Sequence, residues 1–175
     1  MKIEATTKMT YEVYKKYSSF NLTKGKWYKN PVIFMPVLIL LSLINIILQP
    51  ENQTLIILLI ILIVAEIAMI FLVNYAPKKY YKSVEKMFET PSNYTFFDDH
   101  IEIISGNPMV SGTSNCKYDL IYKVYEVKDC FYIYISTVQA YIIPKADITE
   151  GTAEQLRALL QSRVERKKYK VCYKG

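Results

Sequence analysis

The stretch that decides the fold is Leu55–Val73, LIILLIILIVAEIAMIFLV, which is apolar throughout except for Glu66. At about 1.5 Å per residue, a helix of this length approaches the roughly 30 Å of a bilayer's hydrocarbon core. A second apolar run, Val32–Leu48, precedes it and reaches spanning length with its borders included. Both runs could be core helices of a soluble domain, but such helices keep a polar face, and Leu55–Val64 has none. The sequence therefore predicts two membrane-spanning helices.

Only a short polar segment, Gln49–Gln53 followed by Thr54, separates the two runs, so we expect an antiparallel hairpin with both chain ends on one side of the membrane. Lysines set the side, because positively charged flanks stay in the cytoplasm and the connecting segment has no lysine. The flanking lysines are Lys15, Lys16, Lys24, Lys26 and Lys29 before the first run, and Lys78, Lys79 and Lys82 after the second. We predict a multi-pass protein of the cell membrane with both termini in the cytoplasm.

Glu66 is the one ionisable residue inside these runs, and Ser42 and Asn45 are polar residues of the first run. An acid near the centre of a spanning helix costs about 2.5 to 3.5 kcal/mol, which so apolar a helix tolerates. One hypothesis is an intramembrane polar site, either a proton or ion relay or a contact to another subunit. The other is a neutral acid that compensates the kink at Pro36, which is level with Glu66.

The net charge of +6 is concentrated at the membrane flanks, because from residue 83 onward basic and acidic residues are equal in number. This distribution argues against nucleic acid as a partner and predicts attraction to anionic lipid headgroups. The candidate headgroup contacts are Lys78, Lys79, Lys82, Arg166, Lys167 and Lys168. The last three could instead form a solvated helix end that complements the helix dipole.

The residues that usually carry catalysis are missing. There is one histidine, His100, and there is no phosphate-binding loop, nucleophile elbow or paired-ligand metal motif. We expect no enzymatic activity, no metal and no cofactor. Cys116, Cys130 and Cys172 are widely spaced, and we expect them to be inert reduced thiols.

The chain divides into four predicted segments. Residues 1–30 hold a strand over 2–7 and an amphipathic helix from Thr10, which either lies on the membrane surface or docks on the C-terminal domain. Residues 31–76 form the two-helix transmembrane hairpin, residues 77–91 a helical stalk, and residues 92–175 a small cytoplasmic α+β domain. The sequence leaves open whether the N-terminal strand joins the C-terminal sheet.

The C-terminal domain is predicted to be a curved antiparallel sheet covered by one helix. The strands are expected at residues 94–97, 101–105, 111–117, 122–127, 130–135 and 140–143. Thr152 and Gln155 have the spacing of a capping box, and Leu156, Leu159 and Leu160 give the following helix an apolar stripe.

Several segments of this domain resemble the YcxB-like family of bacterial membrane proteins. They are YTFFDDHIEI (94–103), YDLIYKVYE (118–126), DCFYIY (129–134) and YIIPK (141–145). The resemblance implies a two-helix membrane protein whose terminal domain is similar to a small pleckstrin-homology-like (PH-like) module. It brings no established reaction and no catalytic residues. Where many members have Arg and an aromatic after the Pro-Lys pair, this chain has Ala146 and Asp147, and Lys145 is expected to be a surface charge capping the strand end.

Two functions fit this sequence. The first is a membrane-anchored binding or adaptor protein of the bacterial inner membrane, whose PH-like domain engages an unknown protein partner, or lipid headgroups through Lys117, Lys123, Lys128 and the basic tail. The second is a small oligomeric component of transport or self-protection, in which Glu66, Asn45 and Ser42 line a seam between copies. A Glu66→Leu variant should abolish the second function and leave the first intact.

Overall fold

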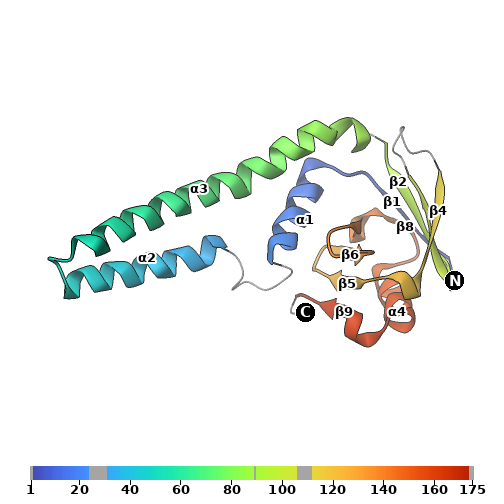
Figure 1. Cartoon of the computed structure of the whole chain (residues 1–175). Helices are drawn as coiled ribbons and strands as arrows, with labels where there is room; N and C mark the ends of the chain where they lie inside the picture. Colours follow the sequence, from blue (N-terminus) through green and yellow to red (C-terminus); the bar gives the residue numbers. More distant parts are fainter. Residues whose placement is uncertain (1, 24–30, 89, 106–111, 174–175) are drawn as a thin grey trace. The chain divides into compact units, whose positions relative to one another are not determined.

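The computed structural model describes residues 2–23, 31–88, 90–105 and 112–173 (Figure 1). The chain is α+β, with helices and two sheets whose pairings are antiparallel except for one. It divides into two compact units. The helical unit is Tyr14–Ser83, and the sheet unit combines Met1–Val13 with Val84–Gly175.

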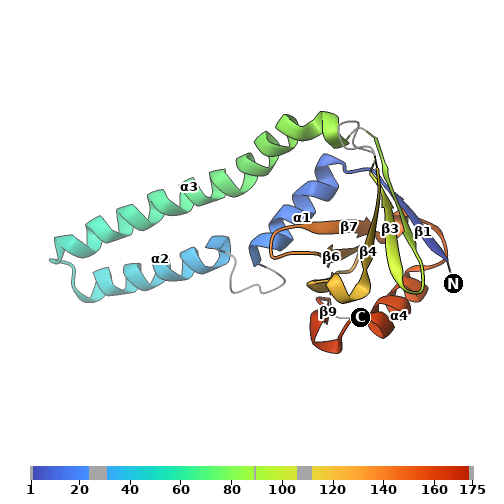
Figure 2. The same cartoon turned by 45° about the vertical axis from the view of Figure 1, so that its right-hand side comes forward.

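The helical unit contains most of α1 (Tyr11–Thr23), together with α2 (Pro31–Leu48) and α3 (Gln53–Val84). Figures 1 and 2 show α2 and α3 side by side, joined by a short turn. Asn52 begins α3, because its side-chain oxygen accepts from the Thr54 amide at 3.1 Å and its carbonyl accepts from the Leu55 amide at 3.1 Å. The hydroxyl of Thr10 accepts from the Val13 amide at 3.3 Å, at the predicted start of α1.

One helix in the described part of the chain, Gln53–Phe88, is long and apolar enough to cross a membrane, with a mean hydropathy of 3.3 over its most apolar window. It consists of α3 and the 3-10 helix η2 (Glu85–Phe88), and it passes through Pro77. The apolar part of α2 within the described residues, Met35–Leu48, is shorter. By length and composition, the structure thus gives one candidate span where the sequence predicts two.

The sheet unit contains two sheets (Figure 2). The first has the strand order β4-β3-β2-β1-β8 and the second the order β7-β6-β5-β9. The strands of the first sheet are β1 (Ile3–Thr7), β2 (Ser92–Phe96), β3 (His100–Ile104), β4 (Thr113–Lys117) and β8 (Ile148–Glu150). Those of the second are β5 (Lys123–Glu126), β6 (Cys130–Tyr134), β7 (Ala140–Pro144) and β9 (Tyr169–Val171). The short 3-10 helices η3 (Tyr118–Leu120), η4 (Lys145–Asp147) and η5 (Arg166–Lys168) connect them.

The N-terminal strand is an inner strand of the first sheet. Ala5 of β1 lies opposite Tyr94 of β2 on one side and opposite Ile148 of β8 on the other. Alternate β1 residues, Ile3, Ala5 and Thr7, are buried, which fixes the face that β1 turns to the core. This answers the question that the sequence leaves open, and it differs from the predicted division, which separates residues 1–30 from the C-terminal domain.

Both sheets contribute to one hydrophobic core, which α4 (Ala153–Arg163) covers with Leu156, Leu159 and Leu160. The predicted capping box is confirmed, since the Gln155 amide donates to Thr152 Oγ1 at 3.2 Å and the Thr152 amide donates to Gln155 Oε1 at 2.9 Å. Gly151, just before the cap, has φ +86°, a conformation that favours glycine. A Cβ there would approach the Ile3 side chain at 3.1 Å.

Two short strands, β8 and β9, lie outside the predicted set, and the single predicted sheet is two sheets. β9 pairs with β5 in parallel, and among the described strands this is the one departure from the predicted antiparallel arrangement. α4 ends at Arg163, where the Val164 amide donates to the Leu160 carbonyl at 2.9 Å. The residues Arg166–Lys168 therefore form a separate 3-10 turn rather than the end of a helix.

Candidate functional site

A glutamate lies on the core face of the second sheet. The register of the β5–β6 hairpin pairs Val124 with Ile133 and Glu126 with Phe131. Because side chains alternate along a strand, Glu126 points to the same face as Val124. Its side chain is 0% exposed. A carboxylate in such a place is tolerated only when charged or hydrogen-bonding groups surround it.

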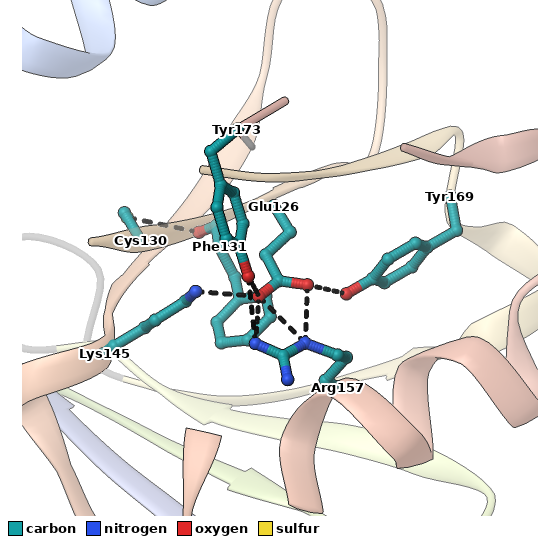
Figure 3. Close-up of polar contacts among 7 residues, drawn as sticks. All are labelled: Glu126, Cys130, Phe131, Lys145, Arg157, Tyr169 and Tyr173. Carbon is teal, nitrogen blue, oxygen red and sulfur yellow. Dashed lines mark hydrogen bonds and ion pairs between the residues drawn. The ribbon is translucent and has the colours of Figure 1, made fainter. Parts of the chain in front are cut away.

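Four side chains from later parts of the chain supply these groups (Figure 3). Arg157 of α4 places Nε 3.0 Å from both carboxylate oxygens of Glu126 and Nη2 2.7 Å from Oε1. Lys145 Nζ, from η4, lies 2.7 Å from Oε1. Tyr169 of β9 donates its hydroxyl to Oε2 at 2.6 Å, and Tyr173 donates its hydroxyl to Oε1 at 2.8 Å. We call these five residues the Glu126 cluster.

The cations of the cluster also contact aromatic groups. The Lys145 ammonium lies 5.1 Å from the ring centroid of Phe131 and 4.7 Å from that of Tyr173, within the range of cation–π attraction. Arg157 Nη2 donates to the Tyr173 hydroxyl at 3.0 Å. The cluster combines one carboxylate with two cations, so it carries a surplus positive charge.

Two opposing effects act on the pKa of Glu126. Burial raises it, and the hydrogen bonds from Arg157, Lys145, Tyr169 and Tyr173 together outweigh burial and lower it from 4.5 to about 2. Burial and the hydrogen bond to Glu126 raise the pKa of Tyr169 above its usual range. The carboxylate is therefore ionised at neutral pH, and Tyr169 keeps its proton.

The cluster attaches the C-terminal segment to the second sheet. The Cys172 amide donates to the main-chain carbonyl of Glu126 at 2.8 Å, beside the parallel pairing of β9 with β5. Glu126 thus holds this segment through its main chain and its side chain. A carboxylate with so low a pKa and so many donors is poorly suited to proton transfer near neutral pH. The arrangement is suited to fixing structure.

Within the described ranges, no group of three or more His, Cys, Asp or Glu residues is placed to hold a metal ion. Cys116, Cys130 and Cys172 are free thiols, and the first two are buried. Burial raises the pKa of Cys130 to about 12, so its reactive thiolate form is scarce at neutral pH.

The three polar residues predicted to form an intramembrane site lie in different surroundings. Glu66 and Ser42 are buried, 8% and 9% exposed. Asn45 is exposed and donates its side-chain amide to the Leu41 carbonyl of its own helix at 2.9 Å. In the described part of the chain, Glu66 Oε2 has no hydrogen-bond partner.

The lysines predicted to contact headgroups are of two kinds. Lys78, Lys79 and Lys82 are exposed on α3. Lys167 and Lys168 pair with Glu165, with Nζ to carboxylate distances of 2.8 and 3.4 Å, and the side chain of Lys167 is exposed as well.

The expectation for Lys145 was wrong. Instead of being a surface charge, Lys145 is 16% exposed and pairs with Glu126. The Glu126 cluster was missed as a whole, although one signal was present, since Glu126 follows Val124 by two residues in a strand whose alternate positions face the core. Nothing in the local sequence marks Tyr169 and Tyr173 as its partners, because they lie in a basic tail far along the chain.

The fold and this cluster define an α+β protein with an apolar helical hairpin and a separate sheet unit. In the sheet unit, a buried ion-pair network joins the C-terminal segment to the second sheet. Residues 96–160 match the family model described as YcxB-like protein. The protein carries a YcxB-like segment, and the resemblance predicted from the sequence is confirmed over these residues. The matched segment covers less than half of the chain and includes Glu126, Lys145 and Arg157 of the cluster. No curated protein and no solved structure matches the chain.

Proposed function

We propose that this protein is a membrane-anchored binding or adaptor protein of the bacterial inner membrane. In this proposal, α2 and α3 cross the bilayer, and the sheet unit is a PH-like domain held at the cytoplasmic surface with both termini. The proposal assigns no reaction to the protein. Its two parts, the anchor and the binding domain, rest on different observations.

The observation that supports the anchor is the exposure of the apolar residues on α3. Ile57, Ile61, Val64, Ile67 and Phe71 are 58% to 63% exposed. A continuous apolar surface of this kind is rare on soluble proteins and is typical of surfaces that contact lipid or a partner. The lysines at both ends of the hairpin favour the cytoplasmic placement of the termini.

The binding role is supported by the architecture of the sheet unit. This unit has its own core and four strands at sheet edges, β4, β8, β7 and β9, where a partner can add a strand. The Glu126 cluster holds β9 at one of these edges, because Tyr169 of β9 donates its hydroxyl to Glu126. In this proposal, such a unit presents a binding surface close to the membrane.

The anchor is tested by membrane fractionation with an alkaline carbonate wash. The full-length protein should stay in the pellet, and release into the supernatant would contradict the anchor.

Binding is tested by cross-linking in native membranes, comparing the wild type, a chain truncated after Thr90, and Glu66→Leu. We expect a partner that is lost on truncation and kept in Glu66→Leu. A partner that survives truncation would contradict a binding role of the sheet unit.

One observation favours a second candidate, the oligomeric membrane component that uses Glu66. The buried oxygen Oε2 of Glu66 lacks a hydrogen-bond partner among the described residues, and a polar group from another copy could supply one. The side-chain amide of Asn45 already donates a hydrogen bond to the Leu41 carbonyl of its own helix, so it depends less on a partner from another copy. A homo-oligomer that cross-links in the wild type and not in Glu66→Leu would support this candidate.

A further inference from the structure

A groove of about 380 Å³ lies between α1 and α3, within the helical unit. Tyr14, Ser18 and Leu22 line it from α1, at intervals of four residues that place them on one face of that helix. On α3 its lining includes Leu72 and Ala76. These lining residues are mostly apolar, and no part of this groove belongs to the Glu126 cluster.

The groove is elongated and has an aromatic end. Its α3 lining extends from Met69 to Tyr80, which corresponds to about 16 Å at the helical rise. At the Tyr80 end, the ring of Tyr14 stacks on that of Tyr80 with a centroid distance of 5.6 Å. The Tyr81 ring lies 6.1 Å from Tyr14. Tyrosine rings prefer the level of the lipid headgroups, which orients the groove with its Met69 end toward the hydrocarbon core.

Basic residues lie near the aromatic end of the groove, whereas the nearest acidic residue of α3, Glu66, lies about one turn before Met69 at the opposite end. Residues 14–23 and 67–84 contain Lys15, Lys16, Lys78, Lys79 and Lys82 and no acidic residue. A helix turns about 100° per residue, so Lys15 is next to the Tyr14 face and Lys79 flanks the stripe of Ala76 and Tyr80. Lys78 and Lys82 fall on the opposite side of α3 by the same spacing. This spacing places Lys15 and Lys79 beside the two walls of the groove, outside the set of residues that line it.

We propose that this groove binds one anionic phospholipid. Its acyl chain lies along the apolar stripe of α3, and Lys15 and Lys79 bind its phosphate. Charge complementarity selects this occupant, because an apolar slot with two lysines beside its aromatic end, and with Glu66 beyond its opposite end, matches a hydrocarbon chain that ends in a negative headgroup. The inference rests on the proposed membrane anchor, which places the groove where such lipids are abundant.

The test measures lipid retained by the full-length protein after mild extraction from bilayers containing equal amounts of phosphatidylglycerol and phosphatidylcholine, by native mass spectrometry. The groove variant is Lys15→Gln with Lys79→Gln. The control, Lys78→Gln with Lys82→Gln, removes the same charge from the other side of α3. A third variant, Ala76→Trp, keeps every lysine and fills the groove.

We expect the wild type and the control to retain one phosphatidylglycerol. The groove variant should retain at least about tenfold less, because two phosphate contacts are lost. Ala76→Trp should also lose the lipid. Equal loss in the two lysine variants would overturn the site in favour of diffuse surface attraction, and equal retention of phosphatidylcholine would overturn the selection for an anion.

A protein dimer without bound lipid would also overturn the proposal and assign the groove to a second copy of the chain. The membrane fraction of every variant is recorded before extraction. A wild type that stays in the membrane and retains no phosphatidylglycerol overturns the groove alone. A wild type absent from the membrane overturns the proposed anchor.

Discussion

Glu126 has no exposed surface, yet its carboxylate accepts from Arg157, Lys145, Tyr169 and Tyr173. A buried ion pair adds little net stability compared with an apolar replacement of the whole network. Removing one member is different, because the charges left behind have lost their partner in a poorly hydrated place. The attachment of residues 169–173 to the second sheet therefore depends on the side chain of Glu126, which lies more than forty positions earlier in the sequence.

Glu126→Gln should lower the free energy of unfolding of the sheet unit by about 3 kcal/mol, because Lys145 and Arg157 lose their counter-charge. It should also speed hydrogen exchange of the Cys172 amide, which bonds the Glu126 carbonyl. Denaturant unfolding and hydrogen exchange of the full-length protein in detergent measure both effects. The control is Glu150→Gln at the exposed edge strand β8, and equal loss of stability in the two variants would contradict the role of the cluster.

The pH dependence of stability follows from the pKa of Glu126, which folding lowers from 4.5 to about 2. A lowered pKa gives stability that is fully present above about pH 4.5 and is lost as the pH falls toward 2. The loss amounts to about 3 kcal/mol at 1.36 kcal/mol per pKa unit. Unfolding free energies at pH 6, 4 and 3 should fall more steeply for the wild type than for Glu126→Gln, and parallel curves would rule out this contribution.

Among the elements, β1 connects the two ends of the sheet unit. It lies between β2 and β8, so its main-chain hydrogen bonds hold a strand that follows the helical hairpin and another that comes near the C-terminus. Ile3, at one end of β1, is 0% exposed, and its side chain packs against Gly151, which precedes α4. The N-terminal residues are thus part of the core of a unit encoded mostly after residue 84.

Ile3→Ala should cost about 2 to 5 kcal/mol, the range for deleting a large buried aliphatic side chain. Deleting residues 1–8 should abolish cooperative unfolding of the sheet unit, because β2 and β8 lose their shared neighbour. Thermal unfolding of the full-length variants measures both. The matched control is Ile104→Ala on β3, where the side chain is 44% exposed, and a loss as large as that of Ile3→Ala would contradict the central position of β1.

For the whole molecule, the proposed topology makes the turn between α2 and α3 and the sheet unit face opposite sides of the membrane. Glu51 lies in that turn, and Lys128 lies in the β5–β6 turn of the sheet unit. The native thiols Cys116 and Cys130 are buried, and Cys172 is partly exposed. Cys172→Ser therefore serves as the parent protein for labelling, because its remaining native thiols are buried.

In intact cells, a membrane-impermeant maleimide should label Glu51→Cys and leave Lys128→Cys unlabelled. Permeabilised cells should give labelling at both positions, which controls for the reactivity of each thiol. Labelling of Lys128→Cys in intact cells would contradict the proposed orientation. If neither introduced cysteine is labelled in permeabilised cells, both positions are covered in the folded protein.

The sequence predicted much of the local structure because the signals are short in range. The apolar runs gave α2 and α3, alternation gave the β5–β6 hairpin, and Thr152 with Gln155 gave the start of α4. It missed β8 and β9, which have three residues each and whose pairing depends on neighbours far along the chain. It identified Glu66, Ser42 and Asn45 as polar, but not that the first two are buried and the third is exposed.

By itself, the sequence determined the type of each long element, the apolar character of the hairpin and the resemblance to the YcxB-like family. These properties depend on neighbouring residues and on simple periodicity. Only the tertiary structure decided that β1 joins the distant sheet and that Glu126 gathers Lys145, Arg157, Tyr169 and Tyr173. The reason is physical: strand pairing and the neutralisation of a buried charge depend on which distant segments the common core brings together, and local pattern carries no record of that choice.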